Sequence, residues 1–244
     1  GQGHKISNLV INMPEAEYVG LVGAITGDSE VRNLVLDATC SFTGKAFMGI
    51  IGGSVNGGTI VMDRLGNEGT VTGSAQNVSG ISGVNMEGKC SFKISNCYVT
   101  GTISGANESA AISGWTSGGT LTNCYSIATV SGVDGNNTFV RSNPATINCY
   151  ENYGNNGCTA ITEEDVTSGR LCYLLNGNQQ EIVFTQCLGE DVLPVISEGH
   201  KQVYLSCPDG LRCDGTALSE NETYTNEPVV IPPHTYDEGI CSVC

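Results

Sequence analysis

Four residues near the C-terminal end of the sequence have side chains that bind metal ions. Cys213, His234, Cys241 and Cys244 follow the order Cys, His, Cys-x-x-Cys, and Cys207 is a further cysteine upstream of them. Zinc takes four nitrogen or sulfur ligands in a tetrahedron, and a Cys-x-x-Cys turn supplies two of them from one segment. The order therefore predicts a structural Cys3His zinc site made by Cys213, His234, Cys241 and Cys244.

The same cysteines are compatible with two other states. An exported protein can form disulfides, for example between Cys207 and Cys213, and the thiols can also remain unpaired. Residues 207–244 contain few apolar side chains, whereas ordering the backbone costs about 1–2 kcal/mol per residue. We therefore expect a cross-link, either zinc or a disulfide, to order this tail.

Catalytic motifs are missing from the sequence. The histidines are His4, His200 and His234, and none is followed by Glu, so His-Glu-x-x-His is absent. A Gly-x-Ser-x-Gly elbow is absent as well. His200 and Trp115 are single residues with no partner in the pattern, and we interpret both as packing or surface residues.

Acidic residues are sparse in the first part of the chain. Four of the early ones are Asp28, Glu30, Asp37 and Asp63. They do not recur at matching repeat positions, which would place two carboxylates about 5–9 Å apart as glycoside hydrolysis requires. The sequence therefore predicts that the chain is not an enzyme. The alternative is a carbohydrate-active enzyme on a β-helix scaffold, whose acids converge only on folding.

Three short elements recur along residues 6–150 and define the architecture. Gly-apolar-x-Gly occurs at 20–23, 49–52 and 80–83, with a degenerate copy at 111–114, so the copies start 29, 31 and 31 residues apart. An apolar-x-Asn element ends at Asn8, Asn33, Asn96 and Asn123, and a shortened copy, Ile147-Asn148, ends at Asn148. Residues 60–62 supply the remaining copy with Met62 in place of Asn. A closing Gly-Thr-Ile-Ser-Gly type of element occurs at 69–73, 101–105 and 128–132.

Units of this length and composition are typical of the coils of a solenoid. The sequence predicts a mainly β protein: a β-helix (β-solenoid) of about six coils with a small α+β C-terminal cap and tail. Glycines are expected to supply the positive-φ corners. The five asparagines should stack at one corner, with Cys97, Cys124 and Cys149 stacked beside them. Because coils lie about 4.8 Å apart and Cys is a favoured buried residue, we interpret these cysteines as structural.

A family resemblance supports the same architecture. Gly-Leu-Val-Gly at 20–23, Gly-Thr-Ile-Ser-Gly at 101–105 and the Asn-Cys-Tyr steps that begin at Asn96, Asn123 and Asn148 resemble the GLUG repeat, named for Gly-Leu-any-Gly. That repeat is found in bacterial surface adhesins of the filamentous-haemagglutinin kind and in the non-catalytic part of IgA-cleaving metallopeptidases. The resemblance covers residues 6–150 and implies architecture, and without His-Glu-x-x-His it does not imply protease activity.

Composition divides the chain near residue 151. Residues 1–150 hold 24 of the 33 glycines, 10 acids and 7 bases, whereas residues 151–244 hold 15 acids and 3 bases. We predict a solenoid at 1–150, a cap at 151–206 and a Cys/His-containing tail at 207–244. In the cap, Thr162 to Asp165 looks like a capping box, residues 171–175 a helix ended by a left-handed residue, and 181–184 and 202–205 two strands.

The cap also resembles a known segment. Residues 161–206 resemble a segment that follows such repeats in surface proteins of gut-dwelling Gram-negative anaerobes, and tails of that kind often carry the His and the Cys-x-x-Cys together. An open solenoid end exposes strand edges that invite pairing with other chains. We therefore interpret this segment as a cover for the last coil.

Charge and hydropathy restrict the partners. The formal charge is −15, with 10 Lys and Arg against 25 Asp and Glu, which argues against nucleic acid and anionic membranes. No apolar run approaches the roughly 20 residues of a membrane span. Residues 1–5 lack the apolar region of a signal peptide, as expected of a processed or trimmed product. We therefore expect a secreted or cell-surface module that is structural or adhesive and binds an extracellular glycan or protein.

Overall fold

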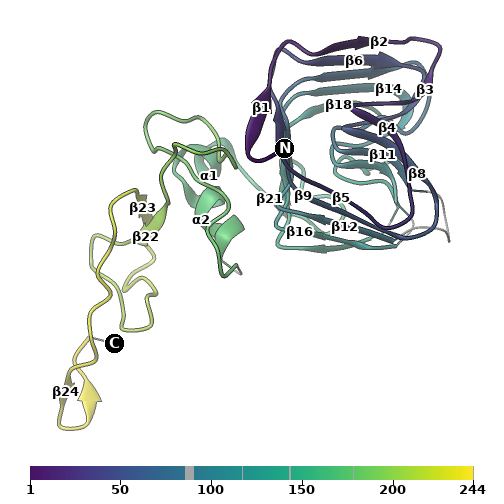
Figure 1. Ribbon diagram of the computed structural model, residues 1–244. Coiled ribbons are helices and arrows are strands. Elements are labelled where there is room, and N and C mark those ends of the chain that lie inside the picture. The colour runs from purple at the N-terminus through teal and green to yellow at the C-terminus, as the bar shows by residue number, and fades with distance from the viewer. Residues whose placement is uncertain (86–90, 117, 143, 178, 244) are drawn as a thin grey trace. The chain divides into compact units, whose positions relative to one another are not determined.

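The structure is a computed structural model that describes residues 1–85, 91–116, 118–142, 144–177 and 179–243. It contains two compact units (Figure 1). The solenoid unit comprises Gly1–Ile161 and Ile196–Glu198, and the helical unit comprises Thr162–Val195 and Gly199–Cys244. The solenoid continues beyond residue 150 because β21 (Thr159–Ala160) pairs in parallel with β20 (Tyr150–Glu151).

The solenoid unit is a stack of parallel strands, as predicted from the repeats. Its largest sheet has ten strands: β1 (His4–Ile6), β5 (Ser29–Leu36), β9 (Thr59–Asn67), β12 (Ser91–Ser95), β13 (Tyr98–Val99), β16 (Thr120–Thr122), β17 (Tyr125–Ser126), β19 (Ala145–Ile147), β20 and β21. The five-stranded sheet contains β2 (Val10–Asn12), β6 (Ser41–Gly44), β10 (Thr70–Gly73), β14 (Thr102–Ser109) and β18 (Thr129–Val133). The four-stranded sheet contains β4 (Val22–Thr26), β8 (Ile51–Asn56), β11 (Ser82–Asn85) and β15 (Ser113–Trp115), and β3 (Glu17–Val19) pairs with β7 (Ala46–Met48).

The solenoid makes about four turns, fewer than the six coils expected from the repeats. Successive strands of the five-stranded sheet lie side by side in Figure 1, and β5, β9, β12 and β16 run along another face. The number of turns follows from the four-stranded sheet, to which each complete turn contributes one strand. The ten-stranded sheet has more strands because the chain also passes through it before the first complete turn and after the last one. Repeat elements therefore overcount turns at both ends of the stack.

One corner of each turn is formed by a residue in the left-handed region. Asn33, Asn96, Asn123 and Asn148 have φ between 52° and 56°, and the strand registers on either side stack them in one column. Asn tolerates this conformation better than most residues because its short amide bonds locally. The amides also bond along the column, with Asn148 Nδ2 donating to Asn123 Oδ1 at 2.8 Å. The asparagine column is therefore confirmed for these four residues.

Two members of the predicted column are elsewhere. Ile6 pairs with Leu36, so Asn8 lies past the corner, where its N–H donates to Thr39 Oγ1. Met62 pairs with Ile94 on the interior face, and Arg64, with φ 56°, occupies the corner of its turn. Both errors arise because an apolar-x-Asn match in one strand does not specify the register against its neighbours.

The glycines of the solenoid have two roles. Gly27 (φ 70°), Gly58 (φ 95°) and Gly119 (φ 91°) lie at corners between strands, as expected from the sequence. The glycines of the Gly-x-x-Gly elements serve close packing instead. None of their glycines at 20, 23, 49, 52, 80 and 83 has a positive φ. A Cβ at Gly52 would lie 2.6 Å from the carbonyl carbon of Tyr18, and a Cβ at Gly49 would lie 2.8 Å from that of Ile81. Adjacent turns thus touch backbone to backbone, which only glycine permits.

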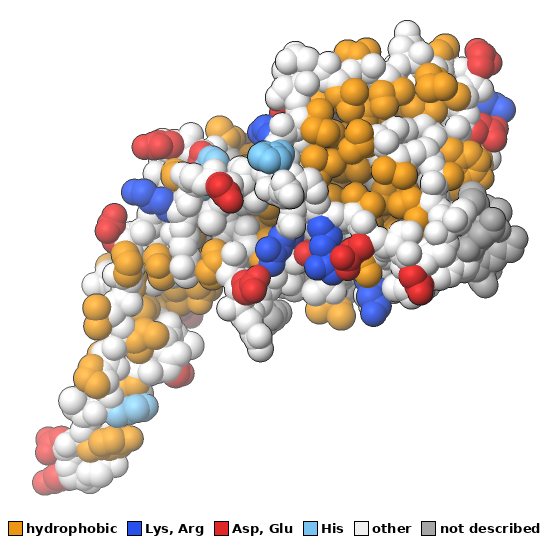
Figure 2. Space-filling view, in the orientation of Figure 1, with side chains coloured by type: hydrophobic (Ala, Val, Ile, Leu, Met, Phe, Trp, Pro, Cys, Tyr) orange, Lys and Arg blue, Asp and Glu red, His pale blue; other side chains and the backbone are white. Residues whose placement is uncertain are grey.

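The interior is filled by columns of apolar side chains. Phe42, Val71 and Ile103 are paired in register across the five-stranded sheet, and each is at most 1% exposed. The N-terminal turn has a neighbouring turn on one side only. Its apolar residues Ile11 and Val22 are therefore only partly buried. Apolar side chains gather on the face of the solenoid that Figure 2 shows. Burial of these stacked apolar side chains is the main stabilising contribution to the solenoid unit.

The helical unit is small and held by local contacts. The capping box of α1 (Glu163–Thr167) forms as predicted, with Thr162 and Asp165 bonding reciprocally. Helix α2 (Arg170–Asn176) ends at Gly177 with φ −56°, so the expected left-handed end is wrong, and Gly169 before α2 has φ 91° instead. The remaining strands form two antiparallel pairs: β22 (Tyr204–Ser206) with β23 (Thr223–Thr225), and β24 (Tyr236–Asp237) with β25 (Ile240–Cys241).

The strand expected at 181–184 does not form. The side chain of Asn176 takes the backbone groups of this segment instead: its Oδ1 accepts from the N–H groups of Val183 and Phe184, and its Nδ2 donates to the Phe184 carbonyl. The second expected strand, at 202–205, overlaps β22. A buried amide thus replaces a strand pairing that the residue types alone suggest.

We predict that Gly52→Ala lowers the free energy of unfolding of the solenoid unit by about 3 kcal/mol, because the new methyl group overlaps the Tyr18 backbone. Urea unfolding followed by circular dichroism measures this change. The matched control is Gly27→Asn, at φ 70° with nothing within 4 Å of its Cβ, which should cost less than about 1 kcal/mol. Equal losses in the two variants would contradict the close-packing role.

Candidate functional sites: a cysteine–histidine cluster and a hydroxyl-lined sheet

Three of the four predicted zinc ligands lie together in the helical unit. The ligand atoms of Cys213, His234 and Cys241 are all within 4.8 Å of one another. The two Sγ atoms are 3.6 Å apart, and Cys241 Sγ is 3.6 Å from His234 Nδ1. Cys244 lies outside the described residues. The structure therefore brings a Cys2His set together from segments that are far apart in the sequence.

Two turns position these side chains. Glu238 and Gly239 have φ 50° and 84° and form the tight turn between β24 and β25, which returns Cys241 to His234. Cys213 lies in a loop closed by Arg212 N–H donating to the Thr216 carbonyl at 2.7 Å, and Asp214 Oδ1 accepts from Thr216 N–H. Left-handed residues and an Asp-capped turn thus determine where the ligands meet.

The separations within the cluster are compatible with ligands of one tetrahedral metal ion. Zinc bond lengths of about 2.3 Å to sulfur and 2.0–2.1 Å to nitrogen put ligand atoms about 3.5–3.8 Å apart, close to the two 3.6 Å separations. A disulfide requires sulfur atoms about 2.05 Å apart. Cys207 is not part of this cluster; it packs with Leu211 and Ala217, and its Sγ lies 3.4 Å from Ser219 Oγ.

The cysteine column of the solenoid forms as predicted and is longer than expected. Pairing of Tyr98 with Tyr125 and of Tyr125 with Tyr150 stacks Cys97, Cys124 and Cys149, and pairing of Tyr150 with Thr159 adds Cys158. All four are buried. Burial raises the pKa of the Cys124 thiol well above its usual value, and a hydrogen bond to Cys124 together with burial raises the pKa of Cys149. Neutral, enclosed thiols of this kind act as packing residues.

Hydroxyl groups line the outer face of the five-stranded sheet. They form two rows in register: Ser41, Thr70, Thr102, Thr129, and then Thr43, Thr72, Ser104, Ser131. Their neighbours along each strand point into the core, and Ser131 Oγ donates to Ser104 Oγ at 3.0 Å. Strand geometry spaces such a grid at about 4.8 Å across strands and 6.6 Å along them. At one edge of the sheet, Val10 and Asn12 of β2 continue the two rows, and Val10 is 66% exposed. None of the residues in the two rows is charged.

Each of the four early acids named from the sequence has a hydrogen-bond or ion-pair partner. Asp28 accepts from Thr59 N–H at 2.7 Å, Asp63 accepts from Ser95 and Asn96, and Glu30 contacts Arg32. Hydrogen bonds from Ser7 and Thr39 lower the pKa of Asp37 to about 2. A carboxyl with that pKa is ionised at neutral pH and cannot serve as a general acid there. These contacts give the four acids structural roles.

Two residues that the sequence analysis left without partners have them. Arg141 lies over the ring of Trp115, with the guanidinium carbon 4.3 Å from the ring centroid. His200 Nδ1 lies 2.6 Å from Asp191 Oδ2, and Cys187 joins them in a second Cys/Asp/His cluster. The spacing of Cys187 and Asp191, four residues apart around a glycine, is the signal that could have indicated a turn presenting both side chains together.

Comparison with known proteins does not identify a relative: no protein-family model, curated protein or solved structure matches the chain. The structure by itself defines the class, a parallel β-solenoid with a small cysteine-containing unit after it. Within the described residues no helix is long and apolar enough to cross a bilayer. Function must therefore be argued from the sites above.

We predict that Cys97 and Cys124 of the native protein resist alkylation from pH 7 to pH 9. A raised pKa keeps the Cys124 thiolate fraction small across this range, and burial blocks the reagent. Pulse labelling with iodoacetamide and peptide mass spectrometry measures the modification, with partly exposed Cys187 as the internal control in chelator. Labelling of Cys124 at the rate of Cys187 would show that the column is accessible.

Proposed function

We propose that the chain is a non-enzymatic secreted or cell-surface adhesion module whose hydroxyl-lined sheet binds an extracellular glycan. The observation that carries the proposal is the grid of eight Ser and Thr side chains on the five-stranded sheet. A face of this kind offers donors and acceptors at regular spacing and little apolar surface. Hydroxyl-rich polysaccharides match it in both polarity and repetition.

Rigidity favours the same function. Each hydroxyl is mounted on a strand whose inward residues, such as Val71 and Ile103, are buried in the core. Side chains held on a fixed backbone lose little conformational entropy when they bind. A neutral face on a chain of charge −15 also favours uncharged partners over polyanions.

The resemblance to GLUG repeats of bacterial surface adhesins adds independent support. The Gly-x-x-Gly packing and the Asn-Cys-Tyr columns occur at the positions that carry the resemblance. Membership of that group would place the protein outside the cell and give the solenoid a presenting or spacing role. An extracellular protein surface is the other partner of the same class.

In this proposal the tail carries a structural zinc ion. Cys213, His234 and Cys241 supply three ligands at suitable separations, and Cys244 is the proposed fourth. The tail contains exposed apolar residues such as Val230 and Ile240 and little core of its own. A closed Cys3His site would contribute folding free energy directly.

We predict that Thr102→Arg reduces glycan binding at least tenfold, because a long cation at the centre of the grid blocks the flat face. The measurement is binding of the full chain to an array of neutral and acidic polysaccharides. Thr120→Arg is the matched control, since Thr120 is an exposed strand threonine on the ten-stranded sheet. Equal binding by the two variants, or no binding by the parent chain, would contradict the assignment of this face.

We predict that zinc chelation or His234→Ala increases proteolysis after residue 206, whereas a reductant alone does not. Loss of the metal leaves the two-turn arrangement without its cross-link. Limited proteolysis with mass spectrometry locates the cuts, and His4→Ala on the solenoid is the control. Sensitivity that follows reductant and ignores chelator would favour a disulfide-ordered tail.

A further inference from the structure

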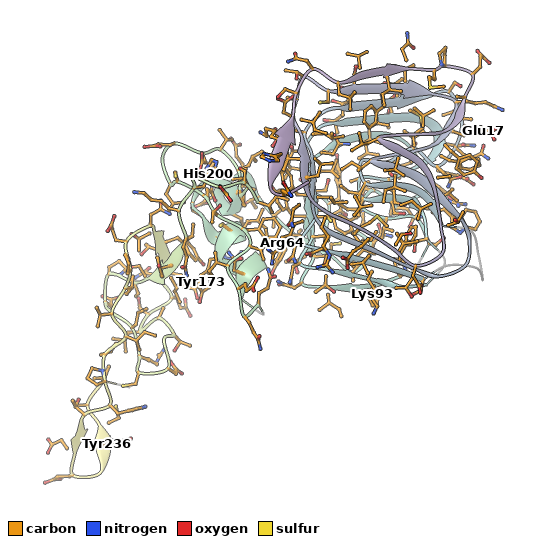
Figure 3. The ribbon with its side chains drawn as sticks, viewed as in Figure 1. Glu17, Arg64, Lys93, Tyr173, His200 and Tyr236 are labelled. Carbon is orange, nitrogen blue, oxygen red and sulfur yellow. The ribbon has the colours of Figure 1, made fainter. Side chains whose placement is uncertain are left out.

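A second group of metal-binding side chains lies in the helical unit. The Sγ of Cys187, a carboxylate oxygen of Asp191 and a ring nitrogen of His200 are all within 4.8 Å of one another. All three residues are partly exposed, with 28% of the His200 side chain and 20% of that of Asp191 accessible. His200 is labelled in Figure 3. The group is thus both convergent and open to solvent.

Cys187 and Asp191 are brought together by a turn. The N–H groups of Glu190 and Asp191 donate to the Cys187 carbonyl at 3.0 and 2.8 Å, and Gly189 has φ 85°. The Asp191 carboxylate in turn accepts from the Cys187 N–H. These bonds close the loop and hold the thiol and the carboxylate on the same side of it.

His200 reaches the turn from a separate segment that is clamped against it. Gln186 N–H donates to the Lys201 carbonyl at 2.8 Å, which joins the residues next to Cys187 and His200. Asn226 bonds to both segments, through its Nδ2 to the Gln186 and Gln202 carbonyls and through its Oδ1 to Leu188 N–H. The backbone on both sides of the group is therefore fixed, as a metal site requires.

We propose that Cys187, Asp191 and His200 form a second zinc site, with three protein ligands and a fourth position open to water. Thiolate, imidazole and carboxylate together match the donor preferences of Zn2+. Three protein ligands with one open position are the arrangement of exchangeable or reactive zinc, whereas a closed set of four is structural. The two clusters of the helical unit then have different coordination.

Binding requires only small changes at the site. The Cys187 thiol releases its proton on coordination, and the neutral imidazole binds through the nitrogen that now contacts Asp191. The 2.6 Å separation between His200 Nδ1 and Asp191 Oδ2 must widen by less than 1 Å to reach the roughly 3.3 Å of two ligands on one tetrahedral ion. Rotation of the two partly exposed side chains supplies that movement without displacing the clamped backbone.

The competing explanation is that Asp191 only caps the turn and pairs with His200. Metal counting on the full chain separates the two. After saturation with Zn2+ and removal of loose metal, we expect two equivalents in the parent protein and in His4→Ala. We expect one in His200→Ala, one in His234→Ala and none in the double variant. Two equivalents in His200→Ala, or a single equivalent in the parent that His234→Ala abolishes, would overturn the proposal.

A spectroscopic variant guards against loss of folding in His200→Ala. Cys187→Ser keeps the size of the side chain and leaves the bond between Asp191 and His200 in place. In the His234→Ala background with Co2+, the near-ultraviolet thiolate-to-metal band should disappear when Cys187→Ser is added. Persistence of that band in a chain with unchanged circular dichroism would overturn the site. If the parent protein binds one zinc equivalent and His200→Ala abolishes it, this second site is supported and the proposal of a zinc ion in the tail is contradicted.

Discussion

Stacking of parallel strands at about 4.8 Å is the constraint on which the solenoid depends. It puts each residue directly on its counterpart in the next turn, so every position must suit a copy of itself. Asn123 and Asn148 meet this demand by bonding amide to amide, Tyr98 and Tyr125 by stacking their rings 5.4 Å apart, and the Gly-x-x-Gly glycines by having no side chain. The outer hydroxyl rows and the inner apolar columns follow from the same rule, because strand side chains alternate between the two faces.

Repetition is also what made the fold predictable from the sequence. Where three adjacent turns carry the same residue type, as at Asn96, Asn123 and Asn148, register is implied and the columns were predicted correctly. Where one turn differs from its neighbours, the sequence motif does not predict its position correctly. Arg64 occupies a corner that Asn occupies in other turns, and Asn8 matches the motif but lies in a different register. Glycines do supply positive-φ corners, as at Gly27 and Gly58, but the close-packing role of the Gly-x-x-Gly glycines was missed because sequence cannot distinguish a positive φ from a close backbone contact.

The helical unit has no repeating positions, and its structure was therefore less predictable from the sequence. Its capping box is a contact between near neighbours and was recognised from Thr162 and Asp165. Its ligand clusters depend on turns and side-chain clamps, such as Asn226 between two segments, which have no repeating signature. Cys213, His234 and Cys241 were found because the chain has only three histidines and the Cys-x-x-Cys spacing is informative, whereas Asp191 is one acid among many in an acidic segment.

Burial of the cysteine column changes the reactivity of these thiols between the unfolded and the folded chain. An unfolded chain exposes all twelve cysteines together, and a thiolate attacks whatever oxidant or disulfide it meets. In the finished solenoid Cys97, Cys124 and Cys149 are buried, and burial raises the pKa of Cys124 and of Cys149, which disfavours their thiolates. Oxidation before coiling would tie together residues that belong to different turns, whereas coiling first withdraws them. In an oxidising compartment, oxidation of the unfolded chain would therefore compete with coiling, and coiling would protect these cysteines by burying them.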